Sequence, residues 1–181
     1  MTLADLLPKQ HINYLQDKAN EILGINKINK IYDINLDIII EKYKNIKVIN
    51  LNQDSKTILK RNKAIIIINN NLDYREYRQE LAEEFCHALL HIGNQINYSK
   101  NVCLTKQENQ AKRMSAYLLC PIKFISNIDI YDNTYALVEE LADLFNVTYN
   151  FMQYRLSLIW GQDIDYIAFN KGQAYGYISV E

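Results

Sequence analysis

The chain has 181 residues, of which 49% are hydrophobic, and this is enough for one complete core of the size typical of a single domain. Its 20 lysine and arginine residues balance 21 aspartate and glutamate residues, and the formal net charge of −1 excludes a global positive field that would attract nucleic acid or anionic membrane. The stretch MTLADLLPKQHINYL lacks the basic and apolar regions of a signal peptide, and no later stretch is long enough to span a membrane. We therefore expect a cytoplasmic protein in which residues 1–181 form one domain.

The first half of the chain predicts two helices and two strands. Apolar residues recur at helical spacing from about Ile12 to Leu23, and Gly24 is the predicted stop. A second helix is predicted after Asn35. The β-branched stretches 46–51 and 63–70 predict a pair of strands, and the Asn-Gln-Asp-Ser stretch between them predicts a turn.

Two stronger helices follow. The first is predicted from Tyr74 to His91, with Gly93 as its stop signal. The second is predicted from Lys106 to Leu119, and it should end before Pro121 because a residue that precedes proline avoids the α region.

The last third predicts a helix, a short break at residues 146–148 and another helix, with Thr148 as the N-cap of the latter. The tail DYIAFNKGQAYGYISV predicts a terminal hairpin or an irregular strand. The three cysteines, Cys86, Cys103 and Cys120, show no C-x-x-C spacing, and their odd number predicts free thiols in a reducing compartment.

The stretch LAEEFCHALLH in the third predicted helix contains a candidate metal site. Residues four apart lie about 40° apart around a helix axis, so Glu83, His87 and His91 share one face, as the two histidines of H-E-x-x-H do. Glu84 lies beside this face, at the place where a zinc protease has its general base.

A metal site on this helix needs a further ligand from elsewhere, and Glu108 at the start of the next helix can supply it. The predicted ligands are Glu83, His87 and Glu108, with an open position for water; in an alternative set His91 takes the place of Glu83. Two carboxylates would reduce the net charge of a Zn²⁺ site and favour harder ions such as Mn²⁺ or Fe²⁺. The simplest alternative is an ordinary amphipathic helix without metal, in which the glutamates are solvated and His87 packs against neighbours.

Several spaced blocks of the sequence resemble the ImmA/IrrE family of metallopeptidase-like proteins between about Ala64 and Leu156. The family's helix F-x-x-A-H-E-x-x-H-x-L-L-H is matched by Ala82, Glu84, His87, Leu89, Leu90 and His91. Its next helix reads approximately E-x-x-A-N-x-F-A-x-x-L-L-M-P and is matched by Glu108, Ala111, Leu118, Leu119 and Pro121, with Ala116 one position after the second alanine of the pattern. A later block is matched by Leu141, Ala142, Phe145, Val147, Arg155 and Leu156.

The chain departs from the family pattern at several positions, three of which lie at or near the candidate site. Glu83 stands where the family has its first zinc-binding histidine, Lys112 where it usually has asparagine, and Met114 where it usually has phenylalanine. The change at Glu83 bears directly on metal binding and catalysis.

The resemblance implies an α+β, zincin-like metallopeptidase domain, mostly helical, with a small β-sheet preceding the active-site helix. The metallopeptidase core would cover about residues 64–121, and a C-terminal helical pair about 134–160. Carried over to this chain, Glu83, His87 and Glu108 would be the metal ligands, Glu84 the general base, and His91 a supporting residue or alternative ligand.

The resemblance also implies a regulatory role, since family members disable a helix-turn-helix repressor of a prophage, another mobile element or a stress operon. The first hypothesis is a hydrolase with Zn²⁺ that cleaves this repressor, with Mn²⁺ or Fe²⁺ as alternative metals. The second is an antirepressor that binds it without hydrolysis and needs no metal. Direct DNA binding by the last helical pair is disfavoured, because its second helix offers only Arg155 as a positive group.

Overall fold

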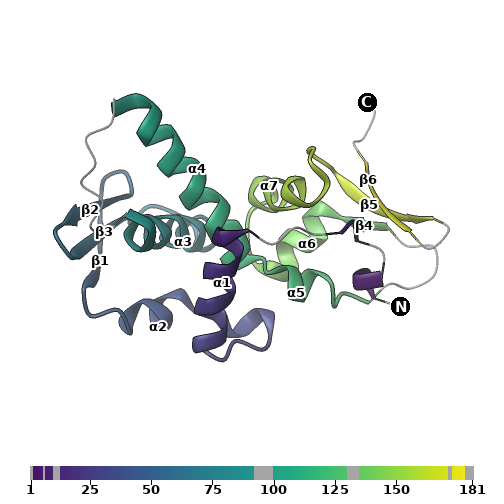
Figure 1. Cartoon of the computed structure of the whole chain (residues 1–181), viewed down its shortest axis with the longest axis horizontal. Helices are drawn as coiled ribbons and strands as arrows, with labels where there is room; N and C mark the ends of the chain where they lie inside the picture. Colours follow the sequence, from purple (N-terminus) through teal and green to yellow (C-terminus); the bar gives the residue numbers. More distant parts are fainter. Residues whose placement is uncertain are drawn as a thin grey trace.

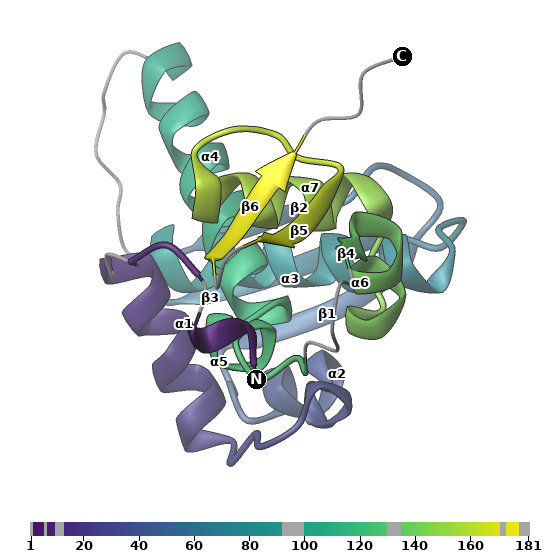
Figure 2. The same ribbon diagram turned by 90° about the vertical axis from the view of Figure 1, so that its right-hand side faces the viewer.

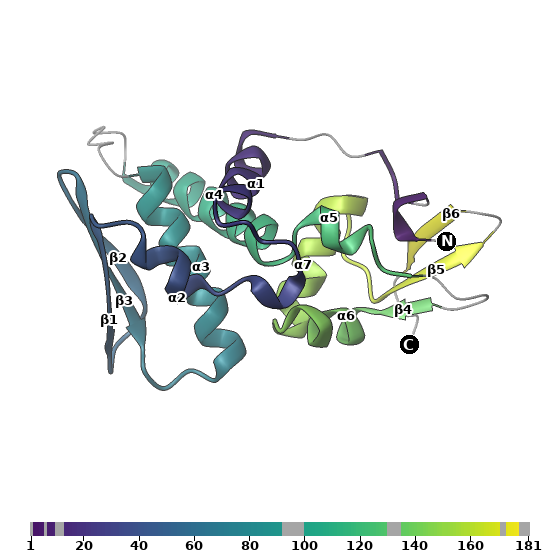
Figure 3. The same ribbon diagram turned by 90° about the horizontal axis from the view of Figure 1, so that it is seen from below.

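The computed structural model describes residues 2–5, 7–9, 13–91, 100–129, 135–170 and 173–177. Two small β-sheets lie at opposite ends of the long axis of the molecule, and helices fill the space between them (Figures 1 and 3). One of these sheets comes just before the helix of the candidate site. The predicted α+β class, mostly helical with a small sheet before that helix, is therefore confirmed.

Helix α1 (Tyr14–Ile25) begins at Asn13, whose side chain accepts hydrogen bonds from two backbone amides of the first turn. The predicted stop at Gly24 is wrong, because Gly24 lies inside the last turn. The helix ends in a Schellman motif. The amide of Lys27 donates to the carbonyl of Gly24, and the amide of Ile28 donates to the carbonyl of Leu23, both at 3.0 Å. Lys27 takes the left-handed conformation this motif requires, with φ 55°.

The first sheet lies beyond α2 (Leu36–Glu41), the predicted second helix, which Asn35 caps. Its strands are β1 (Ile46–Leu51), β2 (Lys56–Lys60) and β3 (Lys63–Asn69) in the order β1-β3-β2. The two predicted strands pair in parallel, and the unpredicted β2 pairs antiparallel with β3. Strand β2 has exposed residues on both faces and is an edge strand, so its sequence lacks the alternation that marks a half-buried strand.

Helices α3 (Tyr74–His91) and α4 (Lys100–Leu119) pack against each other, and α3 also lies against the first sheet (Figure 1). The predicted bounds of α3 are confirmed, while Gly93 lies outside the described residues. Helix α4 ends before Pro121 as predicted but begins six residues earlier than predicted. The stretch before Lys106 holds no glycine or proline that would stop the helix from extending backwards.

Shorter helices follow: α5 (Ile122–Ile125), α6 (Val138–Phe145) and α7 (Tyr149–Trp160). The predicted break between α6 and α7 is confirmed, and the hydroxyl of Thr148 caps α7 by accepting from the amide of Phe151. An ion pair of 2.8 Å between Arg75 and Asp143 joins α3 to α6.

The second sheet contains β4 (Tyr135–Leu137), β5 (Tyr166–Asn170) and β6 (Gln173–Tyr177), all antiparallel, and Figure 2 views the molecule from this end. The predicted terminal hairpin is confirmed by the pairing of β5 with β6. The N-terminal 3-10 helix η1 (Leu3–Asp5) lies near this end, where the amide of Leu3 donates to the carbonyl of Ile128 at 3.0 Å. A second 3-10 helix, η2 (Ile31–Asp33), precedes α2.

Buried apolar side chains from α1 to β5 form one continuous cluster. Cys86 and Cys120 are buried in it as free thiols, as predicted, and burial raises the pKa of the Cys120 thiol to about 12. None of the helices described here is both long and apolar enough to cross a lipid bilayer.

Candidate metal centre

Helix α3 is fixed at its start by a capping box. The Asp73 carboxylate accepts from the amide of Glu76 at 2.9 Å, and the Glu76 carboxylate accepts from the amide of Asp73 at 3.2 Å. Further along, Leu81, Phe85 and other apolar residues are fully buried, and this turns the intervening polar side chains toward α4 and the edge of the first sheet.

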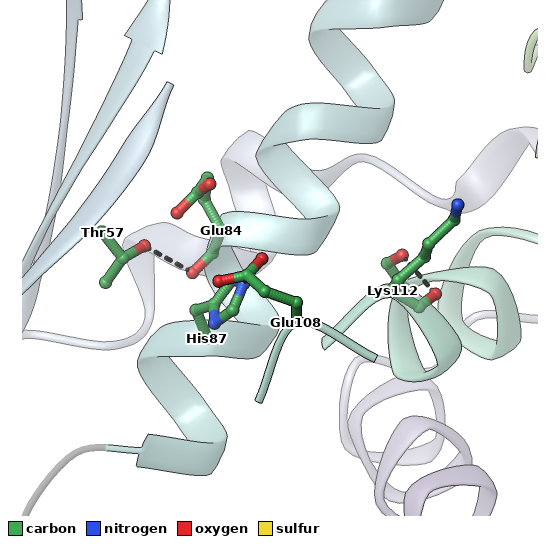
Figure 4. Close-up of polar contacts among 6 residues, drawn as sticks. Thr57, Glu84, His87, Glu108 and Lys112 are labelled. Atoms are coloured by element: carbon green, nitrogen blue, oxygen red, sulfur yellow. Dashed lines mark hydrogen bonds and ion pairs between the residues drawn. The ribbon is translucent and has the colours of Figure 1, made fainter. Parts of the chain in front are cut away.

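Glu83 and His87 from α3 and Glu108 from α4 come together. Their potential ligand atoms all lie within 4.8 Å of one another. His87 Nε2 lies 3.2 Å from Glu108 Oε2, and Figure 4 shows these two side chains, from α3 and α4, pointing toward each other. The His87 side chain is 13% exposed and that of Glu108 60%, so the cluster has a buried side and an open side.

Glu83 lies on the more buried side of the cluster. Burial raises the pKa of its carboxyl, and the neighbouring His87 and Lys112 act in the opposite direction. The Nζ atom of Lys112 lies 4.7 Å from the centre of the Tyr154 ring, in a cation–π contact. Glu83 and Lys112, two of the residues that depart from the family pattern, are therefore electrostatic neighbours.

Glu84 is held close to the cluster by a residue of the first sheet. The hydroxyl of Thr57 in β2 donates a hydrogen bond of 2.8 Å to the main-chain carbonyl of Glu84 (Figure 4). Burial raises the pKa of the Glu84 carboxyl, whereas Thr57 and His87 lower it. No sequence pattern marks Thr57, because β2 itself lacks a strand pattern and its contact with α3 is long-range.

His91 lies one turn beyond His87, with 5.6 Å between the ring centroids. It is 7% exposed, and its Nε2 atom has no hydrogen-bond partner within the part of the chain that the structure describes. Burial and the neighbouring His87 lower its pKa, while a hydrogen bond with the backbone of Gln107 raises it. The structure thus places His91 beside the cluster of three, facing the backbone of α4.

A groove of about 400 Å³ begins at the cluster and runs between α3, α4 and the start of α7. Glu83 and Lys112 line one part of it, and Thr148 and Asn150 another. The edge strand β2 borders α3 on its other side. The groove and the edge strand thus lie on opposite sides of α3, the groove next to Glu83 and the strand next to Glu84.

The last helical pair places its predicted positive group in the core. Arg155 is 2% exposed, its Nε donates to the carbonyl of Cys120 at 2.8 Å, and its guanidinium stacks on the Tyr117 ring at 5.1 Å. Arg155 therefore supports the packing of α7 on α4, and its buried guanidinium is not accessible to a phosphate group of DNA.

Comparisons with known proteins agree with this arrangement. The family model Peptidase_M78, the IrrE N-terminal-like domain, matches residues 41–157. No curated protein sequence matches the chain. Among solved structures, a Mycobacterium tuberculosis transcriptional regulator superimposes with a TM-score of 0.55 at 15% identity, over 81% of this chain and 48% of that one. The chain thus spans about half of that protein, and the likeness is one of fold.

The family match covers β1 to α7, and with it all four residues Glu83, Glu84, His87 and Glu108. The chain belongs to the family of IrrE N-terminal-like domains.

Proposed function

We propose that the chain is a metal-dependent peptidase that acts on a helix-turn-helix repressor in the cytoplasm, with the whole chain working as one domain. The observation that carries this proposal is the convergence of Glu83, His87 and Glu108, whose ligand atoms lie within 4.8 Å of one another. Three side chains from two helices are brought to one point, at the edge of a groove, in a family of peptidase-like domains.

The three side chains suit a divalent cation. Imidazole nitrogen and carboxylate oxygen bind zinc at about 2.0–2.2 Å, so three ligand atoms around one ion lie roughly 3–4 Å apart, close to the spacing found here. The two carboxylates also make Mn²⁺ and Fe²⁺ acceptable. A bound ion would supply Lewis acidity toward a peptide carbonyl and would make a water molecule more acidic.

Glu84 is the residue that we propose as general base. It follows Glu83 directly, lies three residues before His87, and is close enough to His87 and Glu108 for both to act on the pKa of its carboxyl. Its role would be to accept a proton from the attacking water and pass it to the leaving amine. Thr57 would hold this turn of α3 against β2 through the hydrogen bond to the Glu84 carbonyl.

The substrate would lie across the cluster, between the free edge of β2 on one side of α3 and the groove on the other. An edge strand presents unpaired amide and carbonyl groups to which an extended peptide can add. Strand β2 pairs with β3 on one side, and Thr57 in β2 contacts the helix of the site. A helix-turn-helix repressor as substrate is supported by the family resemblance and by the fold shared with a transcriptional regulator.

A second candidate function is antirepression without hydrolysis. The observation in its favour is Lys112, whose ammonium group lies close enough to Glu83 to lower the pKa of that carboxyl. A lysine there can partly neutralise the carboxylates in the absence of a metal. The chain would then bind the repressor in the same groove and release it from DNA intact.

The test combines the untagged protein with the helix-turn-helix repressor encoded nearest to it. Repressor fragments are followed by mass spectrometry and operator release by fluorescence anisotropy. Wild type and the control Glu139→Gln, which alters an exposed carboxylate on α6, should cut the repressor, and Glu84→Gln should not. Operator release without any cut, unchanged in Glu84→Gln, would reject hydrolysis and support the second candidate.

A further inference from the structure

A second cavity, distinct from the groove at the candidate metal centre, lies between α3, α5, α6 and η2. Its volume is about 640 Å³, and its walls come from segments as far apart as Asn29 and Asn146. Sites for small organic ligands usually measure roughly 300–1,000 Å³ and are mostly apolar with a few polar groups. Size alone therefore makes this cavity suitable for a small molecule.

A buried arginine lines the cavity. Arg78 on α3 is 7% exposed, and one of its terminal nitrogens, Nη1, donates to the carbonyl of Ile34 at 2.9 Å. Its Nε has no hydrogen-bond partner, and no ion pair is found for its guanidinium, within the residues that the structure describes. Buried arginine side chains are normally paired, because an isolated charge away from water is costly.

The rim of the cavity exposes large apolar surfaces. Tyr32 is 77% exposed, Tyr74 67% and Leu144 49%, and all three line the cavity. Exposed apolar groups that gather around a concave site mark a binding surface more often than scattered ones do. Lys30 adds a second positive group, with its Nζ 5.4 Å from the centre of the Tyr32 ring.

The charges that line the cavity favour an anionic ligand. Arg78 and Lys30 contribute two positive charges, and Asp129 one negative charge. Asp129 is exposed, while Arg78 is buried, so the unpaired positive charge lies at the inner end. A carboxylate is the group that pairs best with guanidinium, through two parallel hydrogen bonds.

We propose that this cavity binds a small amphipathic carboxylate, with its charged group toward Arg78 and its apolar body against Phe124, Leu144 and the rim tyrosines. Arg78 lies five residues before Glu83 on α3, which is about 7.5 Å along the helix axis and about 140° around it. The cavity and the metal centre thus use different faces of one helix, and the proposal does not depend on peptidase activity.

Isothermal titration calorimetry tests the proposal, with phenylacetate as the probe and phenylacetamide as the uncharged control of similar size. Phenylacetate should bind saturably, and the amide about tenfold more weakly, since the neutral amide cannot form a charge-assisted pair with the guanidinium. Leu144→Glu, which places a negative charge at the mouth, and Arg78→Met should each weaken phenylacetate binding about tenfold or more. Leu51→Glu, an equal change at an exposed position of β1, should leave it unchanged.

Equal affinities for phenylacetate and phenylacetamide would overturn the proposal. So would phenylacetate binding that is unaffected by Leu144→Glu, since that result would place the ligand elsewhere, including at the metal centre. If Arg78→Met does not fold, Lys30→Gln and Leu144→Glu still decide the question, because both residues lie at the surface.

Discussion

The imidazole of His87 and the carboxylate of Glu108 lie 3.2 Å apart, although 21 positions and a change of helix separate them. Glu83 of α3 completes the cluster, in which the potential ligand atoms all lie within 4.8 Å of one another. Because Glu83 stands where the family pattern has a histidine, a metal bound here would meet one more carboxylate than in an H-E-x-x-H site.

Replacing Glu83 with histidine should raise zinc affinity. Imidazole is a neutral, softer ligand, and the change would leave a two-histidine, one-carboxylate site, for which zinc affinity should increase by about tenfold or more. Glu83→Gln should lower the affinity, because it removes a charged ligand. Competition with a fluorescent zinc chelator measures both variants, and equal affinities in Glu83→His and Glu83→Gln would show that position 83 does not face the metal.

Replacing Lys112 with asparagine should also strengthen metal binding. The ammonium group of Lys112 acts on Glu83 and competes electrostatically with a cation at the cluster. Its removal should raise the affinity by about threefold to tenfold, as expected when one partly screened charge is lost. The control is Lys106→Asn, an exposed position on the same helix that no contact links to Glu83. An equal gain in both variants would indicate a general charge effect.

Lys27→Gly should stabilise the protein. Lys27 is exposed and occupies the left-handed position of the Schellman motif, where a residue with a Cβ atom costs about 1 kcal/mol. Urea denaturation should show a gain in the free energy of unfolding of up to about 1 kcal/mol. Lys27→Ala keeps the Cβ atom and should show almost none, and a similar gain in both would contradict the predicted cause.

Tyr149→Phe should change how stability depends on pH. The hydroxyl of Tyr149 donates to Asp165 at 2.7 Å, and this bond, burial and the charge of Asp165 raise the pKa of Tyr149 to about 12. The folded state thus retains the proton that the unfolded state loses near pH 10. The stabilisation is fully present below about pH 10 and is lost as the pH rises toward 12.

The free energy of unfolding of wild type should therefore exceed that of Tyr149→Phe by about 0.5 kcal/mol at pH 8. This value is reduced for solvent screening because the Tyr149 side chain is partly exposed. The difference should shrink at pH 11. Tyr14→Phe, at an exposed position of α1, serves as the control. A difference that is the same at both pH values would contradict the role of the phenolic proton.

Local patterns predicted the parts of the fold that local forces determine. The bounds of α3, the end of α4 before Pro121 and the cap at Thr148 follow from periodicity, proline geometry and side-chain capping. Strand β2 and the parallel pairing of β1 with β3 were missed, because an edge strand carries little burial pattern and strand order depends on distant partners.

The candidate site, too, has features that local sequence predicts and features that depend on long-range contacts. Residue spacing and the family resemblance named Glu83, Glu84, His87 and Glu108, since helix geometry and a spaced motif are visible in sequence. Three other features depend on how α3, α4 and β2 pack: the direction of His91, the proximity of Lys112 to Glu83, and the contact from Thr57. These long-range contacts become visible only in the folded chain.

Zinc binding by untagged protein, measured by calorimetry together with metal analysis, tests the metal centre most directly. Wild type and Glu139→Gln should bind about one ion per chain, as a single three-ligand site with an open position for water predicts. The zinc affinity of His87→Ala and of Glu108→Gln should each fall by about a hundredfold or more. A loss of this size exceeds the loss expected for a residue that only supports a ligand. Zinc binding that is equally strong in His87→Ala, or no zinc binding by folded wild type, would contradict a metal centre at Glu83, His87 and Glu108.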